Sequence, residues 1–458
     1  MKRIGIILAL LAAGLLGRPA QAQLLSGLLS GVTQTLTNTV NTVLAPPHGV
    51  IVRTTLGGDG LAQVCLLNGC TVQASLDGGQ GQLFLVQPVQ GLVPQVLADL
   101  LNLVDGILDA EPDQLIVIPP NQDSAFLFAP PTNLYDSQLV NYYGAPVWNG
   151  YANQPAAYKI NAPNARNWFG VTGTGIVADI DTGVDPNHPA LKGILLQGYD
   201  FTRNQPGASE MNDLTNINGH PCNTCQAAFV NQHTAAMLDQ HTAAMLDGSP
   251  YAAFGHGTEV AGVIHMVAPT AHVLPLKAFR ADGSGDLSDI LRAIYYAVQN
   301  HANVINMSFD MTTSSKELSR AIQYAVGKNV ICVASAGNDG EEEVVYPASI
   351  KSVIGVASTD LFDQRSSFSN YGDQVVWVAA PGENIVTTYP FGTYSAASGT
   401  SFSSPMVAGT VDLILNLRPQ ATPSQAANAV AHAVWIGPNM GYGRLDVVQA
   451  LSAALWTW

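Results

Sequence analysis

Charged residues are scarce in this 458-residue sequence: they make up 11% of it, against 47% hydrophobic residues. Basic residues are the scarcer kind, with 18 Lys and Arg against 33 Asp and Glu, and the formal net charge is −15. Because a surface of this sign repels nucleic acids and anionic membranes, neither is expected as a partner. The 43 glycines and 27 prolines are typical of a loop-rich globular protein rather than of a disordered chain.

Hydrophobic runs long enough to cross a bilayer are also lacking. At the N-terminus, Lys2 and Arg3 precede an apolar run over residues 4–16, which is followed by Ala20-Gln21-Ala22. This pattern predicts a secretory signal peptide over residues 1–22, cut after Ala22. We therefore expect an exported protein, periplasmic or extracellular, without stable membrane insertion.

Cysteines are few, and export of the protein to an oxidising compartment favours disulfides between them. The five cysteines include two close pairs, Cys65 with Cys70 and Cys222 with Cys225, and each pair is expected to form a local disulfide. Cys332 lies within an apolar run, so a buried unpaired thiol is expected there.

The remaining N-terminal part divides into two segments before the main domain. Residues 23–48 carry apolar residues at a helical period without Lys or Arg, which leaves open an amphipathic leader helix or a loosely structured leader. Residues 49–125 show a βαββαβ pattern, typical of a small ferredoxin-like unit, and prolines from Pro119 to Pro131 mark a linker. The expected strands are 50–53, 71–75, 82–87 and 114–118, and the expected helices are 61–67 and 93–104.

Residues 126–458 show alternating strand and helix patterns. The strands are apolar throughout, which burial of both faces requires, and they predict an α/β fold with a doubly wound, mostly parallel sheet. The expected strands are 175–180, 273–275, 304–308, 330–334 and 353–356, and the expected helices are 256–266, 288–300, 316–328, 403–417 and 423–433.

An insertion at about residues 206–251 interrupts this domain. It contains a tandem duplication of eight residues over 232–247, interpreted as a tolerated surface insertion of unknown role. A zinc site formed with His220, Cys222, Cys225, His233 and His241 is one interpretation, but the two later histidines are too widely spaced and export favours a disulfide.

Three short segments in a fixed order each supply one polar side chain. They are Ile180-Asp181-Thr182-Gly183, then HGTEVAG from His256 to Gly262, and then GTSFSSP from Gly399 to Pro405. A serine hydroxyl is a poor nucleophile until an imidazole takes its proton, and the imidazole needs a carboxylate that fixes its tautomer and stabilises its cation. Together the segments indicate nucleophilic serine chemistry.

From about residue 165 to 450 the chain resembles the subtilisin-like serine proteases, in which Asp, His and Ser follow one another in this order. The resemblance includes the three segments and also Ser335-Ala336-Gly337-Asn338, Tyr346-Pro347, Ala380-Pro381-Gly382 and the segment from Gly441 to Leu445. It implies that Asp181 orients the histidine, that His256 is the general base and acid, and that Ser401 attacks the peptide carbonyl. It also implies that the Asn338 side chain and the Ser401 backbone N–H stabilise the oxyanion.

The same resemblance implies that a substrate pairs in extended form with main-chain edges over residues 279–285 and 306–310. The implied substrate-binding residues are Phe279, Gly283, Gly285, Ser308, Phe309, Asp310, Ser335, Ala336, Gly337, Val345 and Thr400. Asp310 and Val345 stand where the family usually has glycine. Val345 predicts a shallower pocket, whereas Glu341-Glu342-Glu343 favours a basic substrate residue; the narrower pocket is the stronger expectation, because such runs are usually solvated loops.

Calcium is a common cofactor of this family, but its best-known site is expected to be lost here. Ala190 replaces the aspartate ligand that usually follows His188-Pro189, and the ligand loop is shortened to residues 265–269. Because calcium needs several converging oxygens, no cofactor is expected at that site, and other calcium sites stay open.

Residues 49–125 resemble the subtilase propeptide, an intramolecular chaperone and inhibitor. The resemblance implies self-cleavage between Pro119 and Thr132, leaving a monomeric catalytic domain over about residues 126–458. The preferred function is thus an exported serine endopeptidase that hydrolyses proteins or peptides. The alternatives are a peptide ligase or cyclase, a narrow processing protease on the same triad, and a non-catalytic peptide-binding protein.

Overall fold

The computed structural model describes residues 49–118, 131–214 and 251–456. The predicted signal peptide, the leader over residues 23–48 and the proposed cleavage segment up to residue 130 lie outside the described residues. So do Cys222, Cys225, the three histidines of the insertion and the duplication over 232–247.

An eight-stranded sheet organises the part of the chain after residue 131. Its strands pair in parallel except β9 with β10. The strand order is β10 (Gln205–Pro206), β9 (Tyr199–Asp200), β11 (His272–Lys277), β8 (Ile176–Asp181), β13 (Val304–Met307), β14 (Ile331–Ser335), β15 (Val353–Thr359) and β16 (Val378–Pro381). The prediction of a mostly parallel sheet is confirmed.

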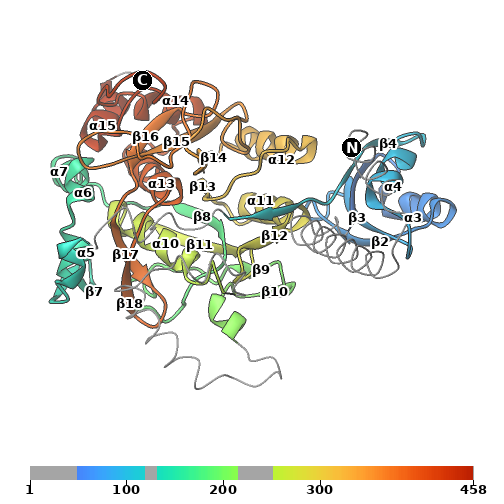
Figure 1. Cartoon of the computed structure of the whole chain (residues 1–458), viewed down its shortest axis with the longest axis horizontal. Helices are drawn as coiled ribbons and strands as arrows, with labels where there is room; N and C mark the ends of the chain where they lie inside the picture. The colour runs from blue at the N-terminus through green and yellow to red at the C-terminus, as the bar shows by residue number, and fades with distance from the viewer. Residues whose placement is uncertain (1–48, 119–130, 215–250, 457–458) are drawn as a thin grey trace, which may run out of the picture. The chain divides into compact units, whose positions relative to one another are not determined.

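Helices cover both faces of this sheet (Figure 1). Alternate residues of a strand point to opposite faces, so Val177 packs with α10 (His256–Val267) and α13 (Thr400–Leu417). Its neighbour Ala178 packs with α11 (Leu287–Gln299) and α12 (Lys316–Gly327) on the other face. The doubly wound arrangement follows from strands that are apolar on both sides.

Several elements around this sheet lack a clear signal in the sequence. They are η1 (Thr132–Tyr135), β6 (Leu139–Tyr142), β7 (Ala145–Trp148), α5 (Asn149–Ala152), α6 (Pro155–Lys159), α7 (Ala162–Phe169), η2 (Glu210–Leu214), β17 (Ile385–Tyr389), β18 (Thr393–Ala397) and α15 (Val447–Trp456). The predicted helix over 423–433 is α14 (Pro423–Val430) and is capped by Thr422 and Gln425. Most of the elements that lack a sequence signal are short, and too few residues repeat in them to show a period.

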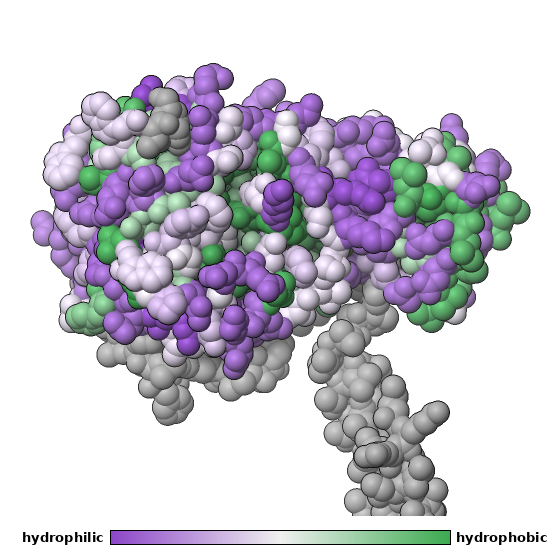
Figure 2. Space-filling view, turned by 90° about the horizontal axis from the view of Figure 1, so that it is seen from above, coloured by the Kyte–Doolittle hydropathy of each residue, from purple (hydrophilic) through white to green (hydrophobic). Residues whose placement is uncertain are grey.

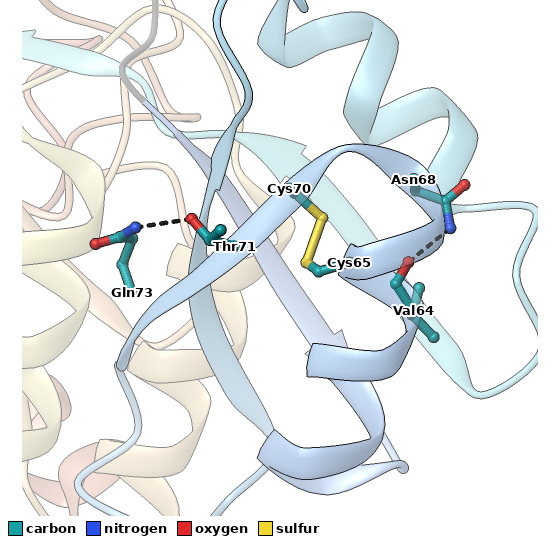
Figure 3. Close-up of a disulfide and its surroundings, with 6 residues drawn as sticks. All are labelled: Val64, Cys65, Asn68, Cys70, Thr71 and Gln73. Atoms are coloured by element: carbon teal, nitrogen blue, oxygen red, sulfur yellow. Dashed lines mark hydrogen bonds between the residues drawn. A yellow bond between two sulfur atoms is a disulfide. The ribbon is translucent and has the colours of Figure 1, made fainter.

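Residues 49–118 form a second, four-stranded antiparallel sheet with the order β2-β3-β1-β4. Along the chain the elements are β1 (Val50–Thr54), α3 (Gly57–Asn68), β2 (Cys70–Ser75), β3 (Leu83–Pro88), α4 (Pro94–Leu101) and β4 (Ile107–Pro112). Both helices contribute to one hydrophobic cluster with β1. Cys65 and Cys70 form the expected disulfide between α3 and β2 (Figure 3).

One strand of this unit was predicted wrongly. The sheet ends with β4 at residues 107–112, whereas the predicted strand over 114–118 forms β5 (Leu115–Val117), which pairs with β12 (Ser284–Asp286) in the following domain. Strand β4 was not recognised in the sequence, because Asp109 and Glu111 interrupt its apolar pattern. In the structure, both side chains face basic or polar groups near α12 instead of solvent.

The surface of residues 49–118 is unusually apolar (Figure 2). Its exposed large hydrophobic side chains are Leu56, Leu66, Leu67, Val89, Val93, Val96, Leu100, Leu103, Leu108 and Val117. Elsewhere, Cys332 is buried and unpaired, as expected, and burial raises the pKa of its thiol to about 12. None of the helices in the described residues is long and apolar enough to cross a membrane.

Helix α10 packs so closely against β17 that a substitution adding one methyl group tests the contact. A Cβ on Gly262 would collide with the hydroxyls of Thr387 and Thr388, whereas a Cβ on Gly327, at the end of α12, would meet nothing. In a Ser401→Ala background, Gly262→Ala should lower the free energy of unfolding by about 1–3 kcal/mol. Gly327→Ala should be neutral or raise it by about 0.5–1 kcal/mol. Urea unfolding compares the two; equal stabilities would contradict this packing.

Candidate active site

The candidate site lies at the carboxyl end of β8, the strand at which the order of strand addition reverses. The chain adds β11 on one side of β8 and then β13 on the other, so the connections leave in opposite directions from this point. Open α/β sheets form their ligand crevices at such switch points. Asp181 is the last residue of β8, so its carboxylate is delivered to this crevice.

His256 is the first residue of α10 and contacts Asp181 directly. Its Nδ1 lies 2.8 and 2.9 Å from the two carboxylate oxygens, and the Thr182 backbone N–H donates a 2.6 Å bond to the same carboxylate. Both residues are buried, with 5% of His256 and 1% of Asp181 exposed. Burial disfavours the imidazolium cation, but the Asp181 carboxylate outweighs burial, so the pKa of His256 is raised.

Ser401 lies in the first turn of α13, beside the imidazole. Its Oγ donates a 3.2 Å bond to the Ser308 carbonyl, while His256 Nε2 is buried and has no hydrogen-bond partner among the described residues. The ring of Phe402, the next residue, is centred 5.7 Å from the His256 ring. The residue after the nucleophile candidate thus packs near the imidazole, and the serine hydroxyl donates its hydrogen bond to the main chain.

Asn338 is held in one orientation by the residue before Ser401. Its Oδ1 accepts bonds of 2.9 Å from the Thr400 N–H and 2.8 Å from the Thr400 hydroxyl. Because the amide oxygen is used in this way, the Nδ2 group remains as the donor that can serve a substrate oxygen. The role of Thr400 is thus to fix the orientation of the Asn338 side chain.

Two buried acids beside the site were not found from the sequence. Glu210 accepts a 2.8 Å bond from the Gly255 N–H and also contacts the Thr258 hydroxyl, and burial raises its pKa to about 8. Asp179 accepts a 2.9 Å bond from Asn306, and burial, followed by the nearby Asp181 carboxylate, raises its pKa. In the sequence, Asp179 could have been recognised as an acid inside an apolar strand. Glu210 lies in the insertion, where no sequence pattern marked it.

The predicted substrate-binding residues fall into two groups. Gly283 and Gly285 lie at the β12 edge, where β5 pairs with them in antiparallel fashion, and the Ile118 N–H donates a 2.9 Å bond to the Gly283 carbonyl. Ser308 and Asp310 follow β13, whereas Ser335 ends the neighbouring strand β14 and Gly337 follows it. In contrast, the side chains of Phe279, Phe309, Ala336 and Val345 are fully buried in the core.

The residues at the position of the usual calcium site offer few oxygen ligands. Ala190 is buried and offers no side-chain oxygen. His265, in the shortened loop, is also buried and lies 2.8 Å from the Tyr151 hydroxyl, and burial lowers its pKa to about 3. Within the described ranges, no group of three or more His, Cys, Asp or Glu could hold a metal ion. Calcium binding elsewhere stays a prediction.

Comparisons with known proteins identify the family of the chain. The Subtilase family matches residues 173–449. Thermitase from Thermoactinomyces vulgaris is 35% identical over 303 residues, which is 66% of this chain and 96% of thermitase. Subtilisin E from Bacillus subtilis (strain 168) is 34% identical over 309 residues, 64% of this chain and 69% of that protein.

Solved structures show the same fold. Fervidolysin from Fervidobacterium pennivorans, a keratinolytic enzyme related to subtilisin, has a TM-score of 0.67 at 23% identity and covers 88% of this chain, which spans 61% of fervidolysin. A lanthipeptide protease has a TM-score of 0.53 at 25% identity, over 66% of this chain and 94% of that chain.

The family match and the relatives define a serine endopeptidase. The chain belongs to the subtilase family. The alternative of a non-catalytic peptide-binding protein is therefore set aside, whereas the finer alternatives of a ligase, cyclase or narrow processing protease remain open.

The contact between Asp181 and His256 predicts a pH effect. The Asp181 charge raises the pKa of His256, and only the neutral imidazole can accept a proton, so activity is lost as the pH falls through that pKa. Asp181→Asn removes the charge and should shift this acid limb to lower pH, while kcat falls by about 10⁴ because the tautomer is no longer fixed. The pH profile of kcat/KM on a peptide substrate checks both; an unmoved acid limb would contradict the assignment.

Proposed function

We propose that this chain is an exported endopeptidase whose triad is Asp181, His256 and Ser401, with Asn338 and the Ser401 N–H as oxyanion donors. The observation that carries the proposal is the buried hydrogen bond between His256 and Asp181, which uses the imidazole Nδ1 and leaves Nε2 without a partner among the described residues. Substrates are the peptide bonds of proteins, as in the relatives named as proteinases.

The proposed reaction begins with a small movement of the nucleophile. Rotation of the Ser401 side chain replaces its bond to the Ser308 carbonyl with one to His256 Nε2, a bond that often tightens only in the substrate complex. As Oγ attacks the carbonyl carbon, His256 takes the hydroxyl proton, and the carbonyl oxygen becomes an oxyanion held by Asn338 Nδ2 and the Ser401 N–H.

The second half of the reaction restores the enzyme. His256 gives its proton to the leaving amine as the peptide C–N bond breaks, and the acyl group stays on Ser401 Oγ. A water molecule then loses a proton to His256 and attacks the ester, and Ser401 leaves with that proton. Asp181 stays ionised throughout, since its role is to stabilise the imidazolium cation.

Residues 49–118 are proposed to inhibit the enzyme by occupying a substrate edge. Strand β5 pairs with β12 in the register Val117 with Ser284 and Ile116 with Gly285. This is the antiparallel, main-chain recognition that an extended peptide substrate would use. The segment therefore competes with substrate along this edge.

Carboxylates anchor this unit to the N-termini of two helices. Asp113 accepts bonds of 2.8 and 2.7 Å from the Ser288 N–H and hydroxyl at α11, and Glu111 accepts a 3.1 Å bond from the Lys316 N–H at α12. Helix N-termini favour negative charge, since their first N–H groups are free. Asp109 adds ion pairs of 3.0 Å to Lys316 and 3.2 Å to Arg320.

A further ion pair, in which the N-terminal unit supplies the cation and α12 the carboxylate, completes the contact. Arg53 on β1 lies 2.7 Å from Glu317, whose side chain is fully buried. Breaking a buried pair of this kind leaves an uncompensated charge and costs about 3–5 kcal/mol. The inhibitory unit is thus matched in charge to α11 and α12, which supports its origin as a docked propeptide.

Expression of the full chain beside Ser401→Ala tests catalysis and maturation together. The wild type should cleave itself between Pro119 and Thr132 and gain peptidase activity, whereas Ser401→Ala should lose only its signal peptide and remain inactive. N-terminal sequencing and mass measurement of both proteins provide the readout. Normal processing of Ser401→Ala in a protease-free host would refute self-cleavage, and normal peptidase activity would refute the nucleophile.

A further inference from the structure

Asp310 occupies a wall beside the proposed nucleophile. It follows strand β13, and Gly337 follows the adjacent parallel strand β14, so the register of these strands brings the two segments side by side. Ser308, two residues earlier, accepts the hydrogen bond of the Ser401 hydroxyl through its carbonyl. A substrate side chain next to the attacked carbonyl must therefore pass along this wall.

The Asp310 carboxylate lies against the glycine of the opposite segment. A Cβ on Gly337 would lie 2.9 Å from Asp310 Oδ2, so the bare backbone of Gly337 makes room for this oxygen. Met311 and Tyr346 exchange two 2.8 Å backbone hydrogen bonds, which place the segment after Val345 against the same wall. Three chain segments thus converge around the carboxylate.

This carboxylate lacks the partners that a buried oxygen normally has. Asp310 is partly exposed as a residue, yet its Oδ2 is buried and finds no hydrogen-bond partner among the described residues. Burying a carboxylate without a hydrogen bond or a counter-ion is costly, and such groups are rarely left without a function. The partner is expected to come from outside the described chain.

The local charge specifies what that partner is. Burial first, and then the carboxylates of Asp339 and Glu343, raise the pKa of Asp310 to about 7. None of the ion pairs within the described ranges includes any of these three acids. Asp339 receives a neutral donor only, the Asn370 amide, at 3.2 Å. The wall is acidic, and no ion pair in the part of the chain that the structure describes neutralises it.

We infer that Asp310 is a specificity-determining residue which selects a cationic lysine or arginine side chain immediately before the scissile bond. The inference rests on the proposed function, since it places the substrate carbonyl at Ser401. A cation of the substrate supplies the missing partner of Oδ2 through a charge-assisted hydrogen bond. Asp339 and Glu343 attract the same cation at longer range.

This inference changes the preference expected from the sequence. There, Val345 favoured a narrower apolar pocket over an acidic one. In the structure, the Val345 side chain is fully buried in the same hydrophobic cluster as Ala336 and Phe309. It therefore shapes the core behind the wall and does nothing to neutralise Asp310.

Kinetics of the self-matured enzyme on peptides that differ only at this residue test the inference. The residue is arginine, lysine, citrulline or leucine, of which citrulline matches arginine in shape but carries no charge. In the wild type, kcat/KM for arginine should exceed that for citrulline by about 10- to 100-fold, the range for a hydrogen bond to a charged group. A ratio near one in active enzyme would overturn the inference and leave the proposed protease intact.

The variant Asp310→Asn keeps the shape of the side chain and removes its charge. It should bring the arginine-to-citrulline ratio close to one, because neither side chain then meets a charged acceptor. An unchanged ratio in Asp310→Asn would overturn the role of Asp310. If this variant does not mature, the wild-type ratio still decides the inference.

Asp339→Asn is the matched control, since Asp339 is a nearby acid that is exposed. Its effect on the ratio should be smaller than that of Asp310→Asn and should vanish at high salt, because solvent screens an exposed charge. An effect equal to that of Asp310→Asn would contradict a specific contact. Inactivity of the wild type on all four peptides would instead count against the proposed endopeptidase function.

Discussion

The buried hydrogen bond between Asp181 and His256 is the interaction on which the rest of this site depends. It joins the end of β8 to the start of α10, and it holds a carboxylate and an imidazole where almost no water reaches them. Its surroundings limit the total charge. Burial raises the pKa of Glu210 to about 8, so this acid favours its neutral form at neutral pH, and burial also raises the pKa of Asp179. Both shifts reduce the negative charge around the contact between Asp181 and His256.

The parallel sheet supplies the remaining geometry. Because β8, β13 and β14 run in one direction, their carboxyl ends meet at one edge and deliver Asp181, Ser308 and Ser335 together. Lys277, at the end of β11, is fully buried there and donates bonds of 2.8 Å to the Thr182 carbonyl and 2.7 Å to Asp213. Helices α10 and α13 then present His256 and Ser401 from their first turns. The fixed strand register thus determines both the proposed catalytic groups and the acidic wall at Asp310.

Much of this arrangement could be predicted from the sequence, and the failures have physical causes. The strands around Asp181, Ser308 and Ser335 were predicted because they are apolar on both faces. Strand β4 was missed because Asp109 and Glu111 satisfy their charges at α12, a contact between residues about 200 positions apart. The orphaned oxygen of Asp310 could not be predicted either, since it depends on the approach of Gly337 in space. Local patterns reveal elements and motifs, whereas pKa values and unpaired atoms arise from tertiary packing.

The central claim is that His256 activates Ser401 although the serine hydroxyl rests on the Ser308 carbonyl in this structure. Labelling of the matured enzyme with a fluorophosphonate tests it most directly, because the reagent forms a Ser Oγ–P bond, with loss of fluoride, at an activated serine. Peptide mapping by mass spectrometry should find one adduct, on Ser401, and none in the His256→Ala variant from which added wild-type enzyme has removed the proposed propeptide. An adduct on another residue, or equally fast labelling of Ser401 in His256→Ala, would contradict the account.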